Sequence, residues 1–499
     1  MSNIRKQSII ASFVVYIGFA VGFFNVYLFT RQGGFTTEQF GLTAVFVAVA
    51  QLMFSIANTG MVAYITKFFP YYNAHLPARQ NDQPAIALTV SFLGFLLVLI
   101  LGFAFKGVVT KIFSNAKELP QYYYWLFPFG FGYTVFTILD AYAWQLHKAV
   151  LSNFLKEVGF RAIVTVLLLL SAFGLLTRFS TFIGLYSFSY IAIALFLFLR
   201  LRGQNHLHLY YRTSKITRRY RKKILALIGF VWGGGFVSSL AAVVDTLFIA
   251  AILPNGIGAA GVFAIGQYIA SLVQAPQRAV AAASIGPLSQ GWKDKDFRRL
   301  NKIYHRSSIN MLLFSCAAFC LVWINFDDAI QTLHLRPEYA GAKWVFFWFG
   351  LTRIVDMGTG VNGQLVSTSI YWRFDFLTGL VLLGLSLPLN FFLTRSMGME
   401  GPALANLISF GIYNTIRYFF LLRKFNMQPF DAKTIYALLL SGACFVLAYF
   451  PFNGFYGLQW LVIRSLTFCI PFGAGMLWLK LSPDAIPVWQ TMKKRLRFA

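Results

Sequence analysis

Apolar residues dominate long stretches of the chain, and short polar segments separate these stretches. A run of about 20 apolar residues is long enough for a helix to cross the hydrocarbon core of a bilayer. The first run is longer than the roughly 7–15 apolar residues of a signal peptide, so we interpret it as the first transmembrane helix. The pattern predicts an all-α membrane protein with about 14 transmembrane helices, at residues 7–30, 39–66, 84–106, 121–146, 155–177, 180–200, 222–252, 257–288, 306–326, 340–371, 374–394, 400–422, 433–452 and 457–481.

A weak internal repeat relates the two halves of the chain at a shift of 220 residues. Six predicted helices separate the two copies, and this even number predicts parallel repeats related by an axis along the membrane normal. The shift carries Gly41 onto Gly261, Asn25 onto Asp245 and Asn58 onto Arg278. The expected organisation is an N-terminal lobe at 1–203, a basic cytoplasmic linker at 204–221, a C-terminal lobe at 222–424, and two further helices with a basic tail at 425–499.

Composition agrees with this class of protein, because 58% of the residues are hydrophobic and only 12% are charged. The net charge is +27, and most Lys and Arg residues fall in the loops on the side of the two termini. The positive-inside rule therefore predicts that both termini are cytoplasmic. The basic segments 212–223 and 293–306 are interpreted as topology signals that contact anionic membrane lipids. Binding to nucleic acid is not expected, because no soluble domain accompanies them.

The loops are short and carry no motif for catalysis or for a cofactor. The sequence has no G-x-x-x-x-G-K-[ST] loop for ATP and no H-E-x-x-H metal motif. Its four cysteines all fall within predicted helices and form no C-x-x-C pair. These features favour a transporter or channel over an enzyme, with no metal, ATP site or other cofactor.

Charged residues inside predicted helices are candidate functional groups, since a charge at the bilayer centre costs about 2.5–3.5 kcal/mol. Asp245 is the only Asp, Glu, Lys or Arg between Ile224 and Gln277. It is expected roughly 10 Å below the external end of its helix. Three interpretations remain open: a group facing a cavity, a structural partner of a cation such as Arg353, or a carboxyl kept neutral by burial.

Three arginines are candidates for binding an anion. Arg278 follows Pro276, which is expected to disrupt the helix locally and to expose backbone polar groups; a side chain that reaches the cytoplasmic interface is the alternative. Arg31 ends the first helix on the external side, either at the mouth of a cavity or as an ordinary interfacial residue. Arg353 lies within the tenth predicted helix.

The tenth predicted helix is polar and rich in glycine, as a cavity wall or a hinge would be. Arg353 and Asp356 are three residues apart and share one helix face, so they could also neutralise each other. Asn362 and Gln364 follow on the same segment.

The remaining intramembrane charges are assigned structural roles. Asp140 and Arg161 lie in adjacent predicted helices and are expected to form an ion pair. Arg417 and Arg464 lie near helix ends, where a long side chain can extend to the interface.

Four segments together resemble the Wzx-type lipid-linked oligosaccharide flippases of the multidrug/oligosaccharidyl-lipid/polysaccharide (MOP) exporter superfamily. They are TRQGGFTTEQFG (30–41), VVDTLFIAAILPNGIGAAGVFAIGQYIASLVQAP (243–276), RPEYAGAKWVFFWFG (336–350) and LPLNFFLTRSMGMEGPALANLIS (387–409). Arg395 departs from the family pattern, which often has an Ile-Pro pair there. The resemblance covers nearly the whole chain in order and spacing.

The resemblance implies two six-helix lobes that open alternately to either side of the bacterial inner membrane. Such proteins move undecaprenyl-pyrophosphate-linked oligosaccharides for surface polysaccharide synthesis, such as O-antigen of lipopolysaccharide. Expected partners are this substrate, membrane lipids, and polysaccharide polymerases or glycosyltransferases, with coupling to H⁺ or Na⁺ and no ATP. The implied cationic cavity residues are Arg278, Arg353 and Arg31; the coupling or cavity polar residues are Asp245, Asp356, Asn25, Asn58, Asn362 and Gln364.

Three other functions compete with this expectation. A cation-coupled drug antiporter of the same superfamily would use cavity acids more than arginines. A membrane glycosyltransferase or O-antigen ligase would need catalytic residues in sizeable external loops, and the loops here are short. A scaffold of a polysaccharide synthase would tolerate charge substitutions within the helices.

Overall fold

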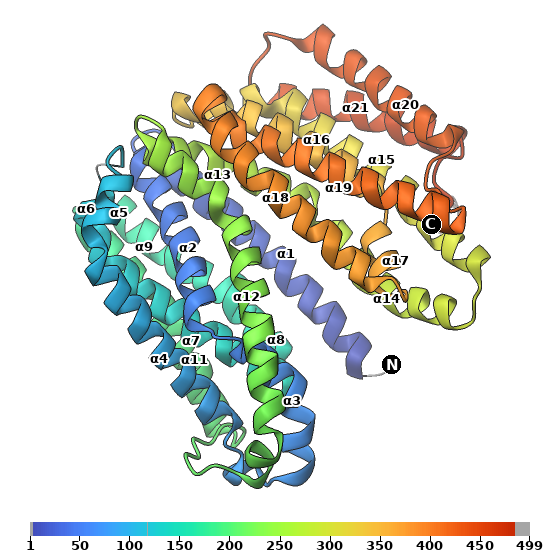
Figure 1. Cartoon of the computed structure of the whole chain (residues 1–499). Coiled ribbons are helices and arrows are strands. Elements are labelled where there is room, and N and C mark those ends of the chain that lie inside the picture. The colour runs from blue at the N-terminus through green and yellow to red at the C-terminus, as the bar shows by residue number, and fades with distance from the viewer. Residues whose placement is uncertain (1–2, 117, 485–499) are drawn as a thin grey trace, which may run out of the picture. The chain divides into compact units, whose positions relative to one another are not determined.

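The computed structural model describes residues 3–116 and 118–484. These residues form helices joined by short loops and contain no β-strand (Figure 1). The chain divides into two compact units, Met1–Gly261 and Val262–Ala499.

Unit 1 contains the helices of the first half of the chain. They are α1 (Asn3–Thr30), α2 (Thr37–Ala57), α3 (Met61–His75), α4 (Gln83–Ala104), α5 (Lys106–Ile112), α6 (Glu118–Tyr122), α7 (Leu126–Gln145), α8 (Ala149–Phe154), α9 (Phe160–Ala172), α10 (Phe179–Ser187), α11 (Ser189–Gly203) and α12 (Lys215–Ile252). Short 3₁₀ turns lie at Ala78–Gln80 and Tyr123–Trp125, and one π-helical turn joins α8 to α9 at Leu155–Gly159.

Unit 2 contains the helices of the second half, and α13 (Gly256–Val273) crosses the boundary between the units. The others are α14 (Ala275–Lys293), α15 (Phe297–Thr332), α16 (Ala342–Gly358), α17 (Asn362–Ser367), α18 (Trp372–Met397), α19 (Gly401–Phe425), α20 (Ala432–Tyr449) and α21 (Leu458–Trp478). Short 3₁₀ turns lie at Pro337–Gly341, Gly398–Glu400 and Phe450–Phe452.

The predicted all-α membrane fold is confirmed. Each segment predicted to cross the membrane is largely helical, and nine helical stretches within the described residues are long and apolar enough to span a bilayer. The repeat pair Gly41 and Gly261 meet where α2 crosses α13, and a Cβ on Gly261 would lie 2.9 Å from the backbone nitrogen of Gly41. The predicted seventh helix, α12, belongs to unit 1.

Several predicted spans are interrupted, and three of the interruptions have a clear local reason. The span 39–66 breaks between α2 and α3, where Thr59 and Gly60 adopt positive φ values of 43° and 77°. The span 257–288 breaks at Gln274, and Pro276 lies in the first turn of α14. Proline is favoured in the first turn of a helix because its missing N–H is not needed there. The span 340–371 breaks between α16 and α17, where Gly360 has φ 65°.

The start of α12 is fixed by a buried carboxylate, Asp82, which is 1% exposed. Asp82 Oδ2 accepts hydrogen bonds from the Ser214 backbone N–H at 2.8 Å and from Thr217 Oγ1 at 2.7 Å. Ser214 also caps α12 by accepting from the Thr217 N–H. The Tyr72 hydroxyl lies 2.6 Å from Thr217 Oγ1, and burial raises the pKa of Tyr72 above its usual value, so the phenol stays protonated.

Asp82→Ala is expected to lower the free energy of unfolding by about 1–3 kcal/mol, because the Ser214 N–H would lose its buried acceptor. Thermal unfolding of the purified protein in detergent measures this change. The matched control is Asp294→Ala, whose exposed carboxylate accepts from Gln290 one turn away; its free energy of unfolding should stay within about 0.5 kcal/mol of wild type. Equal melting temperatures for Asp82→Ala and wild type would rule out this role for Asp82.

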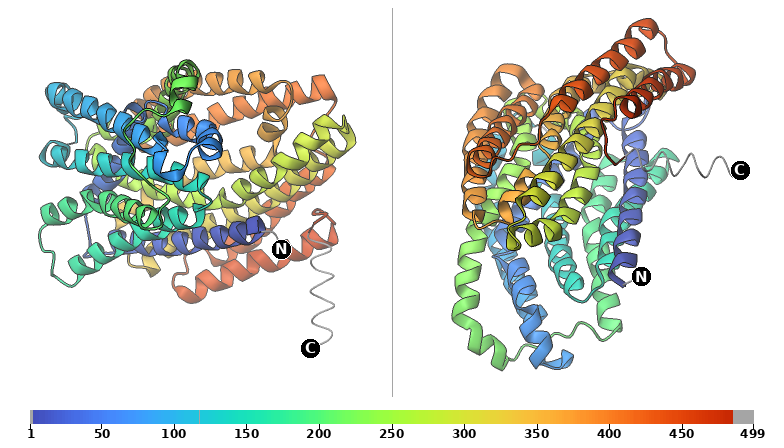
Figure 2. Two further views of the ribbon diagram at one scale, coloured as in Figure 1. Left: turned by 90° about the horizontal axis from the view of Figure 1, so that it is seen from below. Right: turned by 90° about the vertical axis from the view of Figure 1, so that its right-hand side faces the viewer.

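The C-terminal pair α20 and α21 packs beside α15, as both figures show (Figures 1 and 2). Buried residues of the three helices, including Cys316, Cys444 and Phe468, form a continuous apolar core. Many apolar side chains on the opposite faces of α20 and α21 are exposed, for example Leu439 at 64% and Ile470 at 66%. Such faces suit contact with lipid.

Candidate functional site: a polar network between interrupted helices of unit 2

Asp356 lies at the centre of a polar network where two interrupted helices of unit 2 meet. Its Oδ2 accepts a hydrogen bond from Gln277 Nε2 at 2.8 Å, and its Oδ1 accepts one from Asn414 Nδ2 at 3.1 Å. Gln277 lies in the first turn of α14, Asp356 in the last turn of α16, and Asn414 in the middle of α19. One carboxylate therefore ties together three helices that are distant in sequence.

Asn414 extends the network to the other side of the break in the tenth predicted span. Its Oδ1 accepts from Thr359 Oγ1 at 3.0 Å and from Asn362 Nδ2 at 2.8 Å. Asn414 and Asn362 are both nearly completely buried. Buried amides that are satisfied in this way fix the geometry of the surrounding groups.

The break itself needs glycine at position 360. Its backbone has φ 65°, and a Cβ there would lie 2.8 Å from Ser307 Oγ. Ser307 Oγ accepts from the Val361 N–H at 3.3 Å, and the Ser308 hydroxyl donates to the Gly358 carbonyl. Side chains of α15 thus satisfy the backbone groups that the interruption leaves without helical partners.

Two arginines lie next to this network without entering any ion pair of the residues that the structure describes: Arg353 and Arg278. Arg353 is half-buried and Arg278 is exposed. The charge of Arg353 interacts with Asp356 and with Arg278, but the Asp356 oxygens accept from amides rather than from a guanidinium. The predicted Arg353–Asp356 self-neutralising pair is therefore not formed at contact distance.

Arg417 differs from its predicted interfacial position. It is 6% exposed, forms an ion pair with Asp375 of α18, and stacks over the Tyr413 ring at 3.9 Å. Gly363 leaves room for its guanidinium, since a Cβ there would lie 2.8 Å from Arg417 Nη1. The prediction was wrong because the half-buried carboxylate of Asp375 lies within reach and holds the guanidinium inside the unit.

In unit 1, Asn25 joins α1 to α9. Its Nδ2 donates to the Arg161 carbonyl at 2.8 Å, and its Oδ1 accepts from Thr165 Oγ1 at 2.6 Å. Arg161 pairs with Glu157 at 3.4 Å, which corrects the predicted Asp140–Arg161 pair. Glu157 lies one turn away on the same continuous helix, within the π-helical turn, and so it is closer than an acid on α7.

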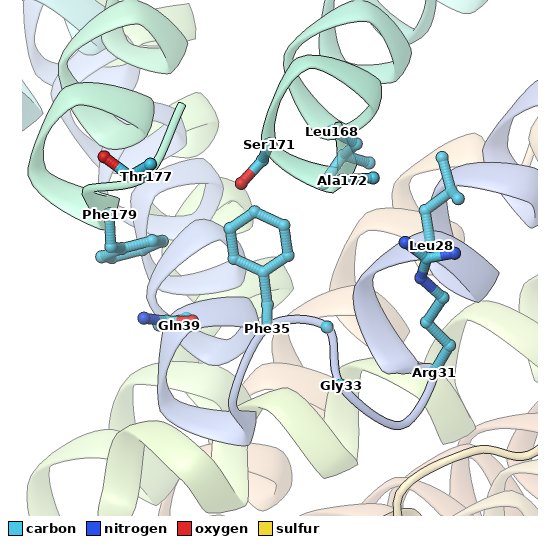
Figure 3. A pocket seen from close by; sticks show the side chains of 11 residues that line it. Leu28, Arg31, Gly33, Phe35, Gln39, Leu168, Ser171, Ala172, Thr177 and Phe179 are labelled. Atoms are coloured by element: carbon cyan, nitrogen blue, oxygen red, sulfur yellow. The ribbon is translucent and has the colours of Figure 1, made fainter. Parts of the chain in front are cut away.

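The other predicted residues of unit 1 take separate positions. Asn58 Oδ1 accepts from the Val62 N–H at 3.0 Å and so caps α3, and it also lines a pocket of about 560 Å³ that includes Trp232 of α12. Asp245 is 5% exposed on α12. Arg31 lines a pocket of about 250 Å³ (Figure 3). Of the predicted residues in unit 2, Gln364 lies half-buried on α17.

Gln277 and Asp375 are two members of these networks that the sequence pattern did not reveal. A single amide beside Pro276 carries no periodic signal, and Asp375 follows Trp372 and Arg373 at a helix start, where acids are common. Asn414, one of two asparagines in α19, proves central to the network.

The fold of this chain is similar to that of several solved transporter structures. No protein-family model matches the sequence, and no curated protein matches it.

Three solved structures illustrate the likeness. The lipid II flippase MurJ, in an inward closed conformation, aligns with TM-score 0.70 and 16% identity over 94% of this chain and 98% of its own. A multidrug resistance MATE family transporter in an inward-facing conformation aligns with TM-score 0.61 and 12% identity over 83% and 94%. The MATE multidrug transporter DinF-BH aligns with TM-score 0.53 and 16% identity over 84% and 95%.

Proposed function

We propose that this protein is an alternating-access flippase that moves undecaprenyl-pyrophosphate-linked oligosaccharides across the bacterial inner membrane, with both termini cytoplasmic. The observation that carries the proposal is the pair Arg353 and Arg278, which lie beside the Asp356 network at the breaks of two helices and enter no ion pair among the described residues. The likeness in fold to a lipid II flippase supports the same class of substrate.

Arginine suits a diphosphate for two reasons. Its planar guanidinium binds phosphate oxygens in a bidentate manner, and it stays protonated. Without such cations, moving the charged diphosphate into hydrocarbon would cost a large desolvation free energy. The interruptions next to Gln277 and Gly360 supply backbone polar groups and points at which the helices can bend.

The energy source in this proposal is not ATP. The membrane potential contributes about 2.3 kcal/mol per unit charge per 100 mV. Coupling to H⁺ or Na⁺ through Asp245 or Asp356, and removal of the product by polymerisation, are further sources. Polysaccharide polymerases and glycosyltransferases are the expected neighbours in the pathway.

A cation-coupled drug antiporter is the second candidate. The observation in its favour is that each unit holds an acid within a membrane helix, the buried Asp245 in unit 1 and Asp356 of the polar network in unit 2, since intramembrane acids suit cation coupling. The likeness in fold to MATE transporters is compatible with it.

Reconstitution separates the two candidates. Proteoliposomes that contain the full chain would receive a fluorescent undecaprenyl-pyrophosphate oligosaccharide, and a membrane-impermeant quencher would report which leaflet holds it. Faster exchange than in empty liposomes supports a flippase. Exchange equal to that of empty liposomes, together with proton- or Na⁺-driven uptake of a cationic dye, contradicts the flippase and supports the antiporter.

A further inference from the structure

The 250 Å³ pocket of unit 1 lies where α1 and α9 end and where α2 and α10 begin. Figure 3 shows the Phe35 ring between Arg31 on one side and Thr177 and Phe179 on the other, with Ser171 above it. Gln39, on the first turn of α2, completes the polar lining.

The charge of this pocket favours an anion. Arg31 is its only charged lining residue, and no carboxylate lines it. Arg31 also belongs to none of the ion pairs found within the described part of the chain. A guanidinium in this setting can bind a carboxylate through two parallel hydrogen bonds.

The neutral groups of the pocket favour a sugar. Gln39 Oε1 accepts from the Thr36 N–H at 3.0 Å, which leaves the NH₂ group as the donor that this side chain can offer. Ser171 Oγ donates to the Leu176 carbonyl at 3.1 Å and keeps its lone pairs as acceptors, and the Thr177 hydroxyl is exposed. A combination of hydrogen-bond donors and acceptors matches the hydroxyl groups of a sugar ring, because each hydroxyl can both donate and accept.

The aromatic groups of the pocket hold a rigid apolar surface beside these polar groups. Phe35 packs against Phe29 at 5.1 Å and against Phe182 at 4.8 Å between ring centroids. Such packing fixes the Phe35 ring, whose face can cover the apolar C–H face of a sugar. The volume of about 250 Å³ lies below the roughly 300–1,000 Å³ of sites for drug-sized ligands, and so it suits one sugar ring.

We propose that this pocket binds one acidic sugar, a hexuronate residue, of the oligosaccharide that the protein moves. This inference rests on the proposed function and assigns part of the substrate to unit 1. The Arg31 guanidinium binds the carboxylate, the Gln39, Ser171 and Thr177 groups bind ring hydroxyls, and Phe35 contacts the ring face. In the proposed orientation the pocket lies on the external side, where the sugar arrives after translocation.

Binding of free monosaccharides tests the proposal without any translocation step. The purified full chain would be placed in phosphatidylcholine nanodiscs, which contain no anionic lipid, and titrated with glucuronate, galacturonate, glucose, acetate and inorganic phosphate while saturation-transfer NMR monitors binding. At least one uronate is expected to bind with a Kd in the millimolar range and at least tenfold tighter than glucose, because one charge-assisted contact distinguishes them.

Variants assign the binding to this pocket. Arg31→Gln is expected to weaken uronate binding at least tenfold, and Thr177→Val to weaken it several-fold. Lys111→Gln removes another exposed cation of unit 1 that does not line the pocket, and it should bind uronate like wild type. Identical elution of all variants in size-exclusion chromatography checks that they are folded.

Several results would overturn the proposal. The first is that uronate binds no tighter than glucose, and the second is that Arg31→Gln binds uronate as tightly as wild type. The third is that acetate or phosphate binds as tightly as uronate, which would indicate a general anion site such as one for a lipid phosphate. The proteoliposome assay decides the proposed function separately. Uronate binding without flipping contradicts the flippase alone, and flipping without uronate binding contradicts the acidic-sugar pocket alone.

Discussion

Arg353→Ala is expected to abolish export of surface polysaccharide while the protein remains in the membrane at wild-type abundance. Arg353 enters no ion pair of the described residues. Its removal therefore deprives no acid of a contacting cation. Its charge is therefore available to a diphosphate, and the loss of a bidentate contact should slow transport far more than it lowers stability. Complementation of a strain lacking its own flippase measures export, and immunoblots of membrane fractions measure abundance.

Arg278→Ala is the parallel variant, and Arg395→Ala is the matched control. Arg395 is an exposed cation of the same unit that stacks over Phe391, apart from the polar network. We expect export to fall in Arg278→Ala and to stay at the wild-type level in Arg395→Ala. Arg353→Lys should retain part of the activity, because a lysine keeps the charge but loses the planar fork. Full complementation by both Arg353→Ala and Arg278→Ala would contradict a cationic substrate site.

The Asp356 network indicates how substrate binding can be linked to helix movement. Asp356 accepts from α14 and α19, and Asn414 in turn contacts both sides of the break between α16 and α17. An anion that draws Arg353 toward it also changes the field at Asp356, because these two charges interact. In the proposed function, the charge of the substrate would therefore act on the hydrogen bonds that join α14, α16 and α19.

The sequence predicted those features of the fold that depend on local chemistry. Runs of apolar residues defined the helices, and Pro276 indicated the break before α14. The glycines after Asp356 likewise indicated a hinge, and Gly360 lies at that break. Each of these features follows from the length of a run or from the backbone preference of one residue.

The pairing of charges between helices was much harder to predict. Arg417 pairs with an acid 42 residues away and Arg464 with one 136 residues away, and no spacing in the sequence encodes such contacts. Arg161 was assigned to a neighbouring helix, although an acid on its own helix lay one turn away. Sequence distance from a helix end therefore proved a poor guide to whether an arginine reaches the interface or stays buried.

Arg464→Met is expected to cause the largest loss of stability, about 3–5 kcal/mol, because it leaves a buried carboxylate without its cation. Arg464 is 5% exposed and Asp328 is completely buried. Arg464 Nη1 lies 3.3 Å from Asp328 Oδ2, and its Nη2 donates to the Phe452 and Phe455 carbonyls. The guanidinium thus joins α15 to the loop before α21. Thermal unfolding in detergent, followed by tryptophan fluorescence, measures the change.

The double variant Asp328→Asn/Arg464→Met distinguishes loss of the ion pair from loss of packing. Asp328 Oδ1 accepts from the Gly457 N–H at 2.8 Å and from Thr332 Oγ1 at 2.7 Å, and an asparagine oxygen can keep these contacts without a charge. The double variant should therefore recover part of the stability that Arg464→Met loses, whereas loss of packing alone would make it no more stable than the single variant. A melting temperature for Arg464→Met equal to that of wild type would show that the Arg464–Asp328 ion pair does not stabilise the contact between α15 and α21.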